Sequence, residues 1–209
     1  MTKPQVTADH YDDPSFRTKG RFASIWHQIN EIERSGAKTV LEIGPGGGFL
    51  QRELPNLLKV KAYSLDIDPM LNPTAVADVR TLPFKDASFD AVVAFEVLEH
   101  LPFNNLEGIL REFARVARKS ILLSLPDAYP FYYLNVTLPL IGVRTLTYTW
   151  QRSTAVNSPN KTHYWEIGLR DYPTKRVVDE LIKGSGFKLI RTFRVLEQQY
   201  HCFFILQRN

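Results

Sequence analysis

Apolar residues recur along this chain at two spacings, which predict where helices and strands lie. Apolar positions three or four residues apart are typical of a helix with one buried face, and they occur over 22–32, 106–116 and 177–182. Short, nearly continuous apolar runs are typical of strands covered on both faces, and they occur over 39–43, 60–67, 74–77, 89–95 and 120–125. A further helix is expected over 49–53, before Pro55, because proline interrupts helical hydrogen bonding. Strands alternating with helices predict an α/β fold.

The expected ends of the helices carry capping residues. Gly36 is placed to end the first helix in a left-handed conformation. Asn104, followed three residues later by Glu107, has the pattern of a capping box at the start of the third helix. Thr174 is the expected cap of the last one.

Two apolar segments at the end of the chain, 187–196 and 200–207, are separated by only a few polar residues. Such a short connection permits an antiparallel hairpin but not a parallel crossover. We therefore predict a doubly wound, mostly parallel seven-stranded sheet with a C-terminal antiparallel hairpin.

Glycine is concentrated directly after the first predicted strand, at Gly44, Gly46 and Gly48, with Glu42 two residues before the first of them. Glycine lets a backbone pass close to a ligand and reach positive φ at little cost. The dinucleotide fingerprint G-x-G-x-x-G would need glycine where this chain has Phe49. The chain also lacks the G-x-x-x-x-G-K-S/T sequence of a nucleoside triphosphate loop.

An acid ends the second predicted strand, where ligands bind in open α/β sheets. Asp66 lies 22 residues after Gly44, and a carboxylate can accept hydrogen bonds from both vicinal hydroxyls of a ribose. Asp68, which precedes a proline, is read instead as a turn residue.

Three motifs together are similar to those of a known family. The E-x-G-x-G-x-G arrangement resembles motif I of the class I S-adenosylmethionine-dependent methyltransferases. The L-P-F-x-D-x-S-F-D block over 82–90 and the V-L-E-H-L segment over 97–101 resemble the type 11 subgroup, which includes ubiquinone- and menaquinone-biosynthesis-like enzymes. The resemblance implies a Rossmann-like methyltransferase fold with S-adenosyl-L-methionine as cofactor.

The resemblance also implies roles for individual residues. The glycine loop would pass under the methionine end of the cofactor, and Asp66 would be the first acid of the family's D-x-D pair. Asp78 and Val79 would read the adenine, although only twelve residues separate Asp66 from Asp78, so the usual intervening helix is missing or very short. Phe95 and Glu96 would lie beside the methyl group and sulfur. The full set of implied cofactor-binding residues is Glu42, Gly44, Gly46, Gly48, Asp66, Ile67, Asp78, Val79, Phe95 and Glu96.

Two histidines are the candidates for a catalytic base. His100 has a side chain that titrates near neutrality, and its alternative role is a structural hydrogen bond to backbone at a helix start. His163 lies in an H-x-W sequence similar to that of ubiquinone-biosynthesis O-methyltransferases, and its alternative role is within an aromatic anchor. No Cys/His cluster has metal-ligand spacing, so no metal site is expected.

Residues 1–209 are expected to form a single domain, with an N-terminal arm over 1–20 and an inserted segment over 127–172 that interrupts the strand–helix alternation. The insertion is rich in tyrosine, phenylalanine and leucine. It is read as a cap, with two further hypotheses: a pocket for a hydrophobic acceptor, such as a prenylated ring or lipid-linked sugar, and a peripheral contact with a membrane surface.

Composition narrows the function classes. The chain has 44% hydrophobic and 23% charged residues, as is usual for globular proteins, and a formal net charge of +4. Its basic residues are scattered, so no specific nucleic-acid binding is expected. The single cysteine, Cys202, lies in an apolar run and is expected to be buried. Without a secretory signal pattern or an apolar run of transmembrane length, a cytoplasmic location is the default.

These observations favour methyl transfer to a small-molecule acceptor by in-line displacement, in which the protein mainly positions the reactants and excludes water. Two other functions stay open. One is a non-catalytic S-adenosylmethionine-binding scaffold. The other is an NAD-dependent oxidoreductase, which Phe49 and the terminal hairpin disfavour. The sequence identifies neither the acceptor nor the oligomeric state.

Overall fold

The computed structural model describes residues 18–138, 144–151 and 162–208. The predicted arm over 1–20 therefore lies almost entirely outside the described residues. Four α-helices and nine strands follow one another within these ranges, with short 3₁₀ turns between some of them. The helices are α1 (Lys19–Arg34), α2 (Phe49–Leu57), α3 (Leu106–Val116) and α4 (Thr174–Ser185). The strands are β1 (Thr39–Ile43), β2 (Lys61–Asp66), β3 (Ala75–Val76), β4 (Phe89–Phe95), β5 (Ala117–Pro126), β6 (Phe131–Leu138), β7 (Arg144–Gln151), β8 (Lys188–Val195) and β9 (Gln198–Gln207).

Seven strands form one sheet in the order β3-β2-β1-β4-β5-β9-β8. The first five are parallel, and β9 runs antiparallel between β5 and β8. The predicted doubly wound, mostly parallel seven-stranded sheet with a C-terminal antiparallel hairpin is confirmed. The strand order reverses at β1: β2 and β3 lie on one side of it, and β4 and β5 lie on the other. The carboxyl ends of β1 and β4 are therefore the switch point of the sheet.

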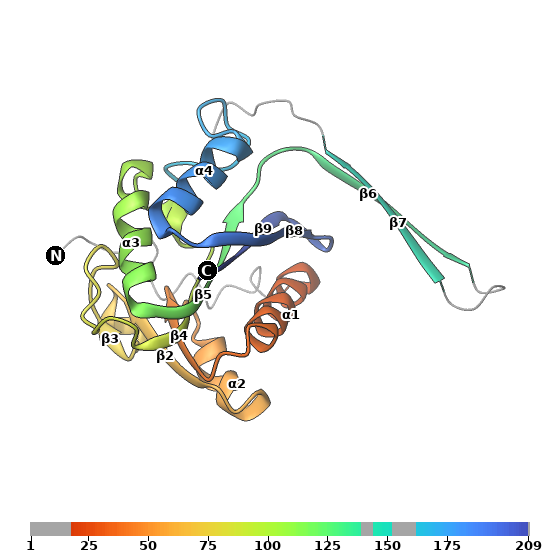
Figure 1. The fold of residues 1–209 in the computed structure, drawn as a ribbon. Coiled ribbons are helices and arrows are strands. Elements are labelled where there is room, and N and C mark those ends of the chain that lie inside the picture. The colour runs from red at the N-terminus through yellow and green to blue at the C-terminus, as the bar shows by residue number, and fades with distance from the viewer. Residues whose placement is uncertain (1–17, 139–143, 152–161, 209) are drawn as a thin grey trace.

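Helices cover both faces of this sheet, with α3 and α4 on one side and α1 and α2 on the other (Figure 1). Neighbouring residues of β4 consequently alternate between two hydrophobic cores. Val92 and Ala94 pack into the core under α3 and α4, whereas Ala91 and Val93 pack into the core under α1 and α2. Burial on both sides explains why this strand is almost entirely apolar. Within the described ranges, no helix combines the length and apolarity needed to cross a membrane.

Gly36 ends the first helix as predicted, with φ +65° directly after the capping residue Ser35. The capping box predicted at the third helix is wrong. A 3₁₀ turn over Phe103–Asn105 precedes α3, so its capping residue is Asn105, which has helical backbone angles and makes no side-chain cap hydrogen bond. Glu107 instead pairs with Arg111 and Lys183.

Two further helix ends differ from the prediction by a few residues. The last helix has Pro173 at its capping position, so Thr174 is its first residue and not its cap. The second helix continues through Pro55 to Leu57. Proline removes one hydrogen bond, but Leu50 and Leu54 stay buried on the same face and the N–H of Leu58 still reaches the carbonyl of Leu54.

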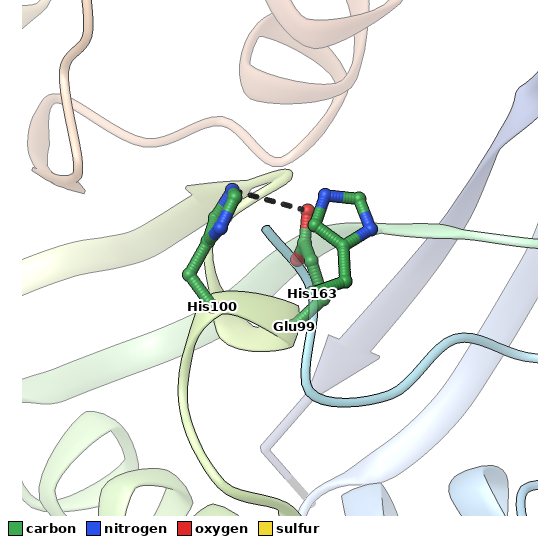
Figure 2. A group of neighbouring side chains, drawn as sticks. All are labelled: Glu99, His100 and His163. Atoms are coloured by element: carbon green, nitrogen blue, oxygen red, sulfur yellow. Dashed lines mark ion pairs between the residues drawn. The ribbon is translucent and has the colours of Figure 1, made fainter. Parts of the chain in front are cut away.

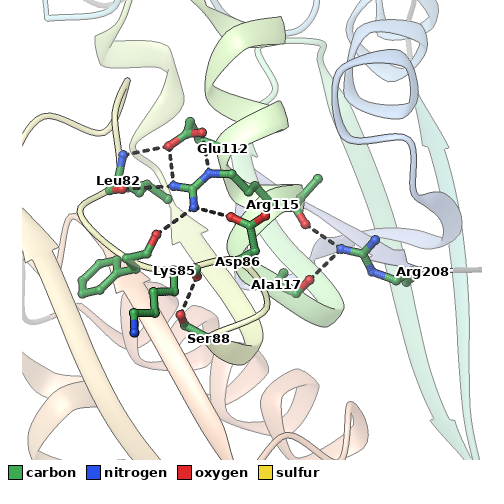
Figure 3. Close-up of polar contacts among 10 residues, drawn as sticks. Leu82, Lys85, Asp86, Ser88, Glu112, Arg115, Ala117 and Arg208 are labelled. Atoms are coloured by element: carbon green, nitrogen blue, oxygen red, sulfur yellow. Dashed lines mark hydrogen bonds and ion pairs between the residues drawn. The ribbon is translucent and has the colours of Figure 1, made fainter.

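The loop between β3 and β4 is held by the guanidinium of Arg115 on α3 (Figure 3). Its Nη1 donates to the carbonyl of Phe84 and to Asp86 Oδ1, at 2.7 and 2.8 Å, and its Nη2 donates to the carbonyl of Leu82 at 3.0 Å. Glu112 Oε2 accepts both from Arg115 and from the backbone N–H of Leu82. The block over 82–90 is thus held against α3 by contacts from its backbone and from the Asp86 side chain.

The inserted segment contains two strands that the sequence analysis did not predict. β6 and β7 pair with each other in an antiparallel ribbon and belong to a separate two-stranded sheet. The ribbon projects away from the rest of the molecule, as Figure 1 shows. The segment returns to the body at Trp165, which is fully buried and donates its indole N–H to the carbonyl of Leu101 at 3.0 Å.

Candidate active site

A cavity of about 710 Å³ opens at the carboxyl ends of β1, β2 and β4. Residues far apart in the sequence line it, from the glycine loop, the ends of these strands and α1. The residues from the predicted site that line it are Glu42, Gly44, Gly46, Asp66, Ile67, Asp78, Val79, Phe95, Glu96 and His100. Gly48 and His163 are predicted site residues that do not line it.

The three glycines of the motif, Gly44, Gly46 and Gly48, have positive φ, between +52° and +67°. The N–H of Gly44 donates to the carbonyl of Leu65 on β2 at 2.9 Å, which fixes where the chain leaves β1. A Cβ on Gly44 would lie 2.6 Å from Cγ2 of Val97, which itself lines the cavity. Gly48 is the capping residue of α2. The loop therefore needs glycine for its backbone angles, and at Gly44 also for space.

Glu42 lies beneath this loop with only 6% of its surface exposed. Burial raises the pKa of Glu42 to about 8, against the opposing effects of Arg52 and of a backbone hydrogen bond from Gln51. Its Oε2 has no hydrogen-bond partner among the described residues. The cavity thus contains a buried carboxyl group that holds its proton near neutral pH and would ionise beside a cationic ligand.

Asp66 and Asp78, the two predicted recognition acids, differ in what already surrounds them. Asp66 Oδ1 accepts the backbone N–H of Asp68 at 2.8 Å, and burial raises the pKa of Asp66. The carboxylate of Asp78 instead accepts hydrogen bonds from Nε of Arg80, at 2.9 and 3.0 Å, and from Nη2. A ligand that binds Asp78 must therefore share it with Arg80. Asp68 caps the 3₁₀ turn Pro69–Leu71 through Met70, so its predicted role as a turn residue is confirmed.

The end of β4 places a second carboxyl group, which is partly buried, against the cavity. Glu96 has φ +57°, which is uncommon for a residue with a side chain, and the strain fits a functional position. Burial raises the pKa of Glu96 to about 8. Its Oε2 lies 3.8 Å from Nε2 of His201. Phe95, immediately before it, packs against Phe203 with 5.6 Å between ring centroids.

The two predicted catalytic histidines meet next to another acid, Glu99 (Figure 2). The rings of His100 and His163 lie edge to face with centroids 4.8 Å apart, and His100 Nε2 is 4.0 Å from Glu99 Oε1. Glu99 is fully buried, and burial together with the nearby carboxyl of Glu96 raises its pKa well above its usual range. His163 Nδ1 lies 2.8 Å from Glu166 Oε1. The structure therefore brings both histidines together, but only His100 reaches the cavity.

These three side chains offer potential ligand atoms that lie within 4.8 Å of one another. Two ligands on one zinc ion are closer, about 3.3 Å apart for bonds of about 2.0 Å in a tetrahedron. Ligand atoms of Glu99, His100 and His163 that are 4.8 Å apart would have to move closer together to bind one zinc ion. The expectation that no metal is bound stays a prediction.

Helix α1 supplies one wall of the cavity through Arg21, Ser24, Ile25 and Gln28, which were not among the predicted site residues. Their spacing of three, one and three residues is that of one helix face, and this periodicity was the available signal. His201 on β9, which also lines the cavity, was not predicted either. Ser24 Oγ and His201 Nδ1 lie 2.8 Å apart, although 177 residues separate them in the chain. Burial, together with Arg21, lowers the pKa of His201 to about 3, so this histidine is neutral.

Parts of this chain are similar to known methyltransferases. Residues 41–124 match the family model described as "Methyltransferase domain". A stretch of 67 residues is 40% identical to 27-O-demethylrifamycin SV methyltransferase of Amycolatopsis mediterranei, and it covers 32% of this chain and 24% of that protein. The match thus spans about a quarter of the length of that relative.

Solved methyltransferase structures share the fold over the whole chain. Magnesium protoporphyrin IX methyltransferase of Synechocystis PCC 6803, solved with bound S-adenosylhomocysteine, superposes with a TM-score of 0.61 at 16% identity and covers 100% of this chain and 90% of its own. A methyltransferase of Aquifex aeolicus gives 0.60 at 15% identity over 100% of both chains. Residues 41–124 are therefore similar to the methyltransferase domain family, and the chain has the Rossmann-like fold of solved S-adenosylmethionine-dependent methyltransferases.

Proposed function

We propose that this protein transfers a methyl group from S-adenosyl-L-methionine to a small-molecule acceptor by in-line displacement. The observation that carries the proposal is the cavity at the switch point of the sheet, where the glycine loop and Asp66 meet. The cofactor supplies a methyl group already activated on a sulfonium. The protein's own task is then to hold the two reactants in line and to exclude water.

Each wall of the cavity suits one part of that cofactor. The backbone at Gly44 and Gly46 leaves room for the methionine end, and Glu42 lies below it as a carboxyl that a bound ammonium would ionise. Asp66 at the end of β2 can accept the ribose hydroxyls. Asp78 and Val79 line the adenine side. Phe95 and Glu96 flank the expected position of the sulfur.

The acceptor is proposed to be a hydrophobic, ring-bearing small molecule. The cavity lining beyond the predicted cofactor residues includes Ile25, Leu101, Pro102 and Tyr164. Of these, Tyr164 belongs to the inserted segment over 127–172, which supports an acceptor-binding role for the end of that segment. The relatives named above are described as acting on a rifamycin and on a magnesium porphyrin, both large ring systems.

His100 is proposed as the base for acceptors that arrive protonated. Its Nδ1 lies 3.0 Å from the carbonyl oxygen of Thr162. Because a carbonyl only accepts, Nδ1 carries the hydrogen and Nε2 keeps its lone pair. The buried carboxyl of Glu99, 4.0 Å from Nε2, would stabilise the positive charge that His100 gains on taking a proton only if Glu99 gives up its own proton. His163 is proposed to hold the ring of His100 in position through their edge-to-face contact.

Calorimetry with S-adenosylhomocysteine tests the cofactor site. Asp66→Ala should weaken binding by about 1.5–3 kcal/mol because it removes hydrogen bonds to a charged group. Asp179→Ala is the control, since Asp179 is exposed on α4 and pairs only with Lys175 among the described contacts. Equal affinity in wild type and Asp66→Ala would reject this role for Asp66, and tight NAD binding without S-adenosylhomocysteine binding would reject the methyltransferase.

The base is tested by methyl transfer from labelled S-adenosylmethionine to ring-bearing hydrophobic acceptors. His100→Gln should lower the transfer rate by about 10²-fold or more with cofactor affinity kept, and His163→Gln should have a smaller effect. A larger loss in His163→Gln would reverse the two roles. Failure of every tested acceptor, with cofactor binding intact, would favour the scaffold function.

A further inference from the structure

The ribbon of β6 and β7 stands apart from the body of the molecule (Figure 1). Neither strand pairs with the seven-stranded sheet. A contact with the body lies at the base of the ribbon, where the guanidinium of Arg194 is 5.0 Å from the ring centroid of Phe131. A two-stranded ribbon alone in water is marginally stable, so a binding partner along its length would stabilise it.

One face of the ribbon is apolar and aromatic. The register places Tyr132 opposite Trp150 and Leu134 opposite Tyr148, and residues two apart on a strand share a face. The rings of Tyr132 and Trp150 stack with centroids 5.1 Å apart. All of these side chains are exposed, from 43% for Tyr132 to 67% for Tyr148, and Val136 on the same face is 39% exposed. We call Tyr132, Leu134, Val136, Tyr148 and Trp150 the aromatic face.

The charge of the surrounding sequence is one-sided. The chain has 22 acidic residues, yet none lies between Asp127 and Glu166. The same stretch carries three basic residues, Arg144, Arg152 and Lys161. The segment therefore presents no side-chain carboxylate to an approaching surface. Its basic side chains attract an anionic surface, and it has no acidic side chain to repel one.

We propose that the aromatic face docks onto the surface of an anionic lipid bilayer. Tyrosine and tryptophan are the side chains that favour the boundary between headgroups and hydrocarbon, because their rings are apolar and their N–H or O–H groups stay hydrated. The lack of acids removes repulsion from anionic headgroups. A second copy of the chain fits less well, since it would present the same acid-free, basic segment and offer no complementary charge.

Docking is separable from the proposed chemistry. None of the described side chains of β6 or β7 lines the cavity, so binding to a bilayer and binding of cofactor should respond to different substitutions. The proposal stands whether or not the acceptor is hydrophobic, and it goes beyond the proposed methyl transfer.

Sedimentation of the full chain with vesicles tests the proposal. Vesicles of phosphatidylcholine with phosphatidylglycerol should bind the protein at low salt, and binding should fall as salt is raised or phosphatidylglycerol is left out. The double variant Leu134→Ser/Tyr148→Ser removes two apolar side chains that face each other on the aromatic face. It should lose about tenfold or more in vesicle partitioning. Tyr133→Ser is the matched control, because Tyr133 is a half-exposed tyrosine on the opposite face.

Affinity for S-adenosylhomocysteine, which should be unchanged in both variants, shows that each one is folded. No vesicle binding at low salt would overturn the proposal, as would equal loss in the double variant and in Tyr133→Ser. Self-association of the wild type that disappears in the double variant, without vesicle binding, would show instead that a second copy covers the face.

Discussion

The two most recognisable sequence motifs, over 42–48 and 82–90, differ in what they do in this structure. The glycine motif over 42–48 lies against the cavity and carries features that cost stability, namely a buried acid and positive backbone angles. The block over 82–90 is fastened to α3 by Arg115 and to the start of β1 by Asp90, whose Oδ2 accepts the N–H groups of Lys38 and Thr39 at 2.8 and 3.2 Å. A recognisable sequence motif therefore shows that the local backbone needs particular residues. It does not show whether that backbone binds a ligand or stabilises the fold.

Replacing Glu42 by glutamine tests whether the buried acid of the glycine motif lowers stability, and it should have the largest effect. A carboxyl whose pKa rises from 4.5 unfolded to about 8 folded holds its proton more tightly in the folded state. The contribution of this raised pKa to the free energy of unfolding is therefore fully present below pH 4.5 and is lost as the pH rises toward 8. Glu42→Gln cannot ionise, so it should be more stable than wild type by up to about 3 kcal/mol at pH 7, with little difference at pH 4.5.

Denaturant unfolding at several pH values measures this effect, and cofactor affinity should fall in the same variant. Glu53→Gln, on the neighbouring helix α2, is the control and should leave the pH dependence unchanged. A Glu42→Gln variant less stable than wild type at pH 7 would mean that Glu42 is ionised in the folded protein and supports the fold.

Much of the cavity lining could be predicted because its residues sit at the ends of buried strands. Gly44, Asp66 and Phe95 each follow a short apolar run, and parallel strands place their carboxyl ends at one edge of a sheet. The α1 wall and His201 could not be found in this way. They reach the cavity through tertiary packing, as the contact between Ser24 and His201 illustrates, and no short motif encodes such a contact.

The fold was likewise predictable where burial decides it. The central strands β1, β4 and β5 have apolar runs because both of their faces are covered. The ribbon was missed because proline residues and a long apolar stretch, from 128 to 143, obscure the two-residue alternation that identifies a strand with one exposed face. The capping box failed because a 3₁₀ turn, which sequence patterns identify poorly, took the position expected for the cap.

Gly44→Ala tests whether the glycine motif needs glycine for space as well as for backbone angle. The left-handed backbone should cost about 1–2 kcal/mol, and the Cβ 2.6 Å from Val97 adds a clash that pushes this side chain in the cavity wall. We expect a total loss of about 2–3 kcal/mol in stability and at least tenfold weaker S-adenosylhomocysteine binding, measured by thermal unfolding and calorimetry.

Gly36→Ala is a close control, since Gly36 has φ +65° and nothing within 4 Å of its added Cβ. It should show the backbone cost alone, with normal cofactor affinity. If both variants bind cofactor equally well, the close approach at Gly44 plays no part in forming the site.

Arg115→Met tests the other motif, and its effect should be limited to stability. The variant keeps most of the apolar stem but removes hydrogen bonds to two backbone carbonyls, and it leaves Glu112 with one partner fewer. Because the Arg115 side chain is only 30% exposed, we expect a loss of about 2 kcal/mol in the free energy of unfolding. Arg111→Met is the control from the same helix, where a 71% exposed side chain pairs with Glu107 and should contribute less than about 0.5 kcal/mol. S-adenosylhomocysteine affinity should stay within about twofold in both variants. A folded Arg115→Met protein that binds cofactor much more weakly would place the 82–90 block in the site and remove the distinction between the two motifs.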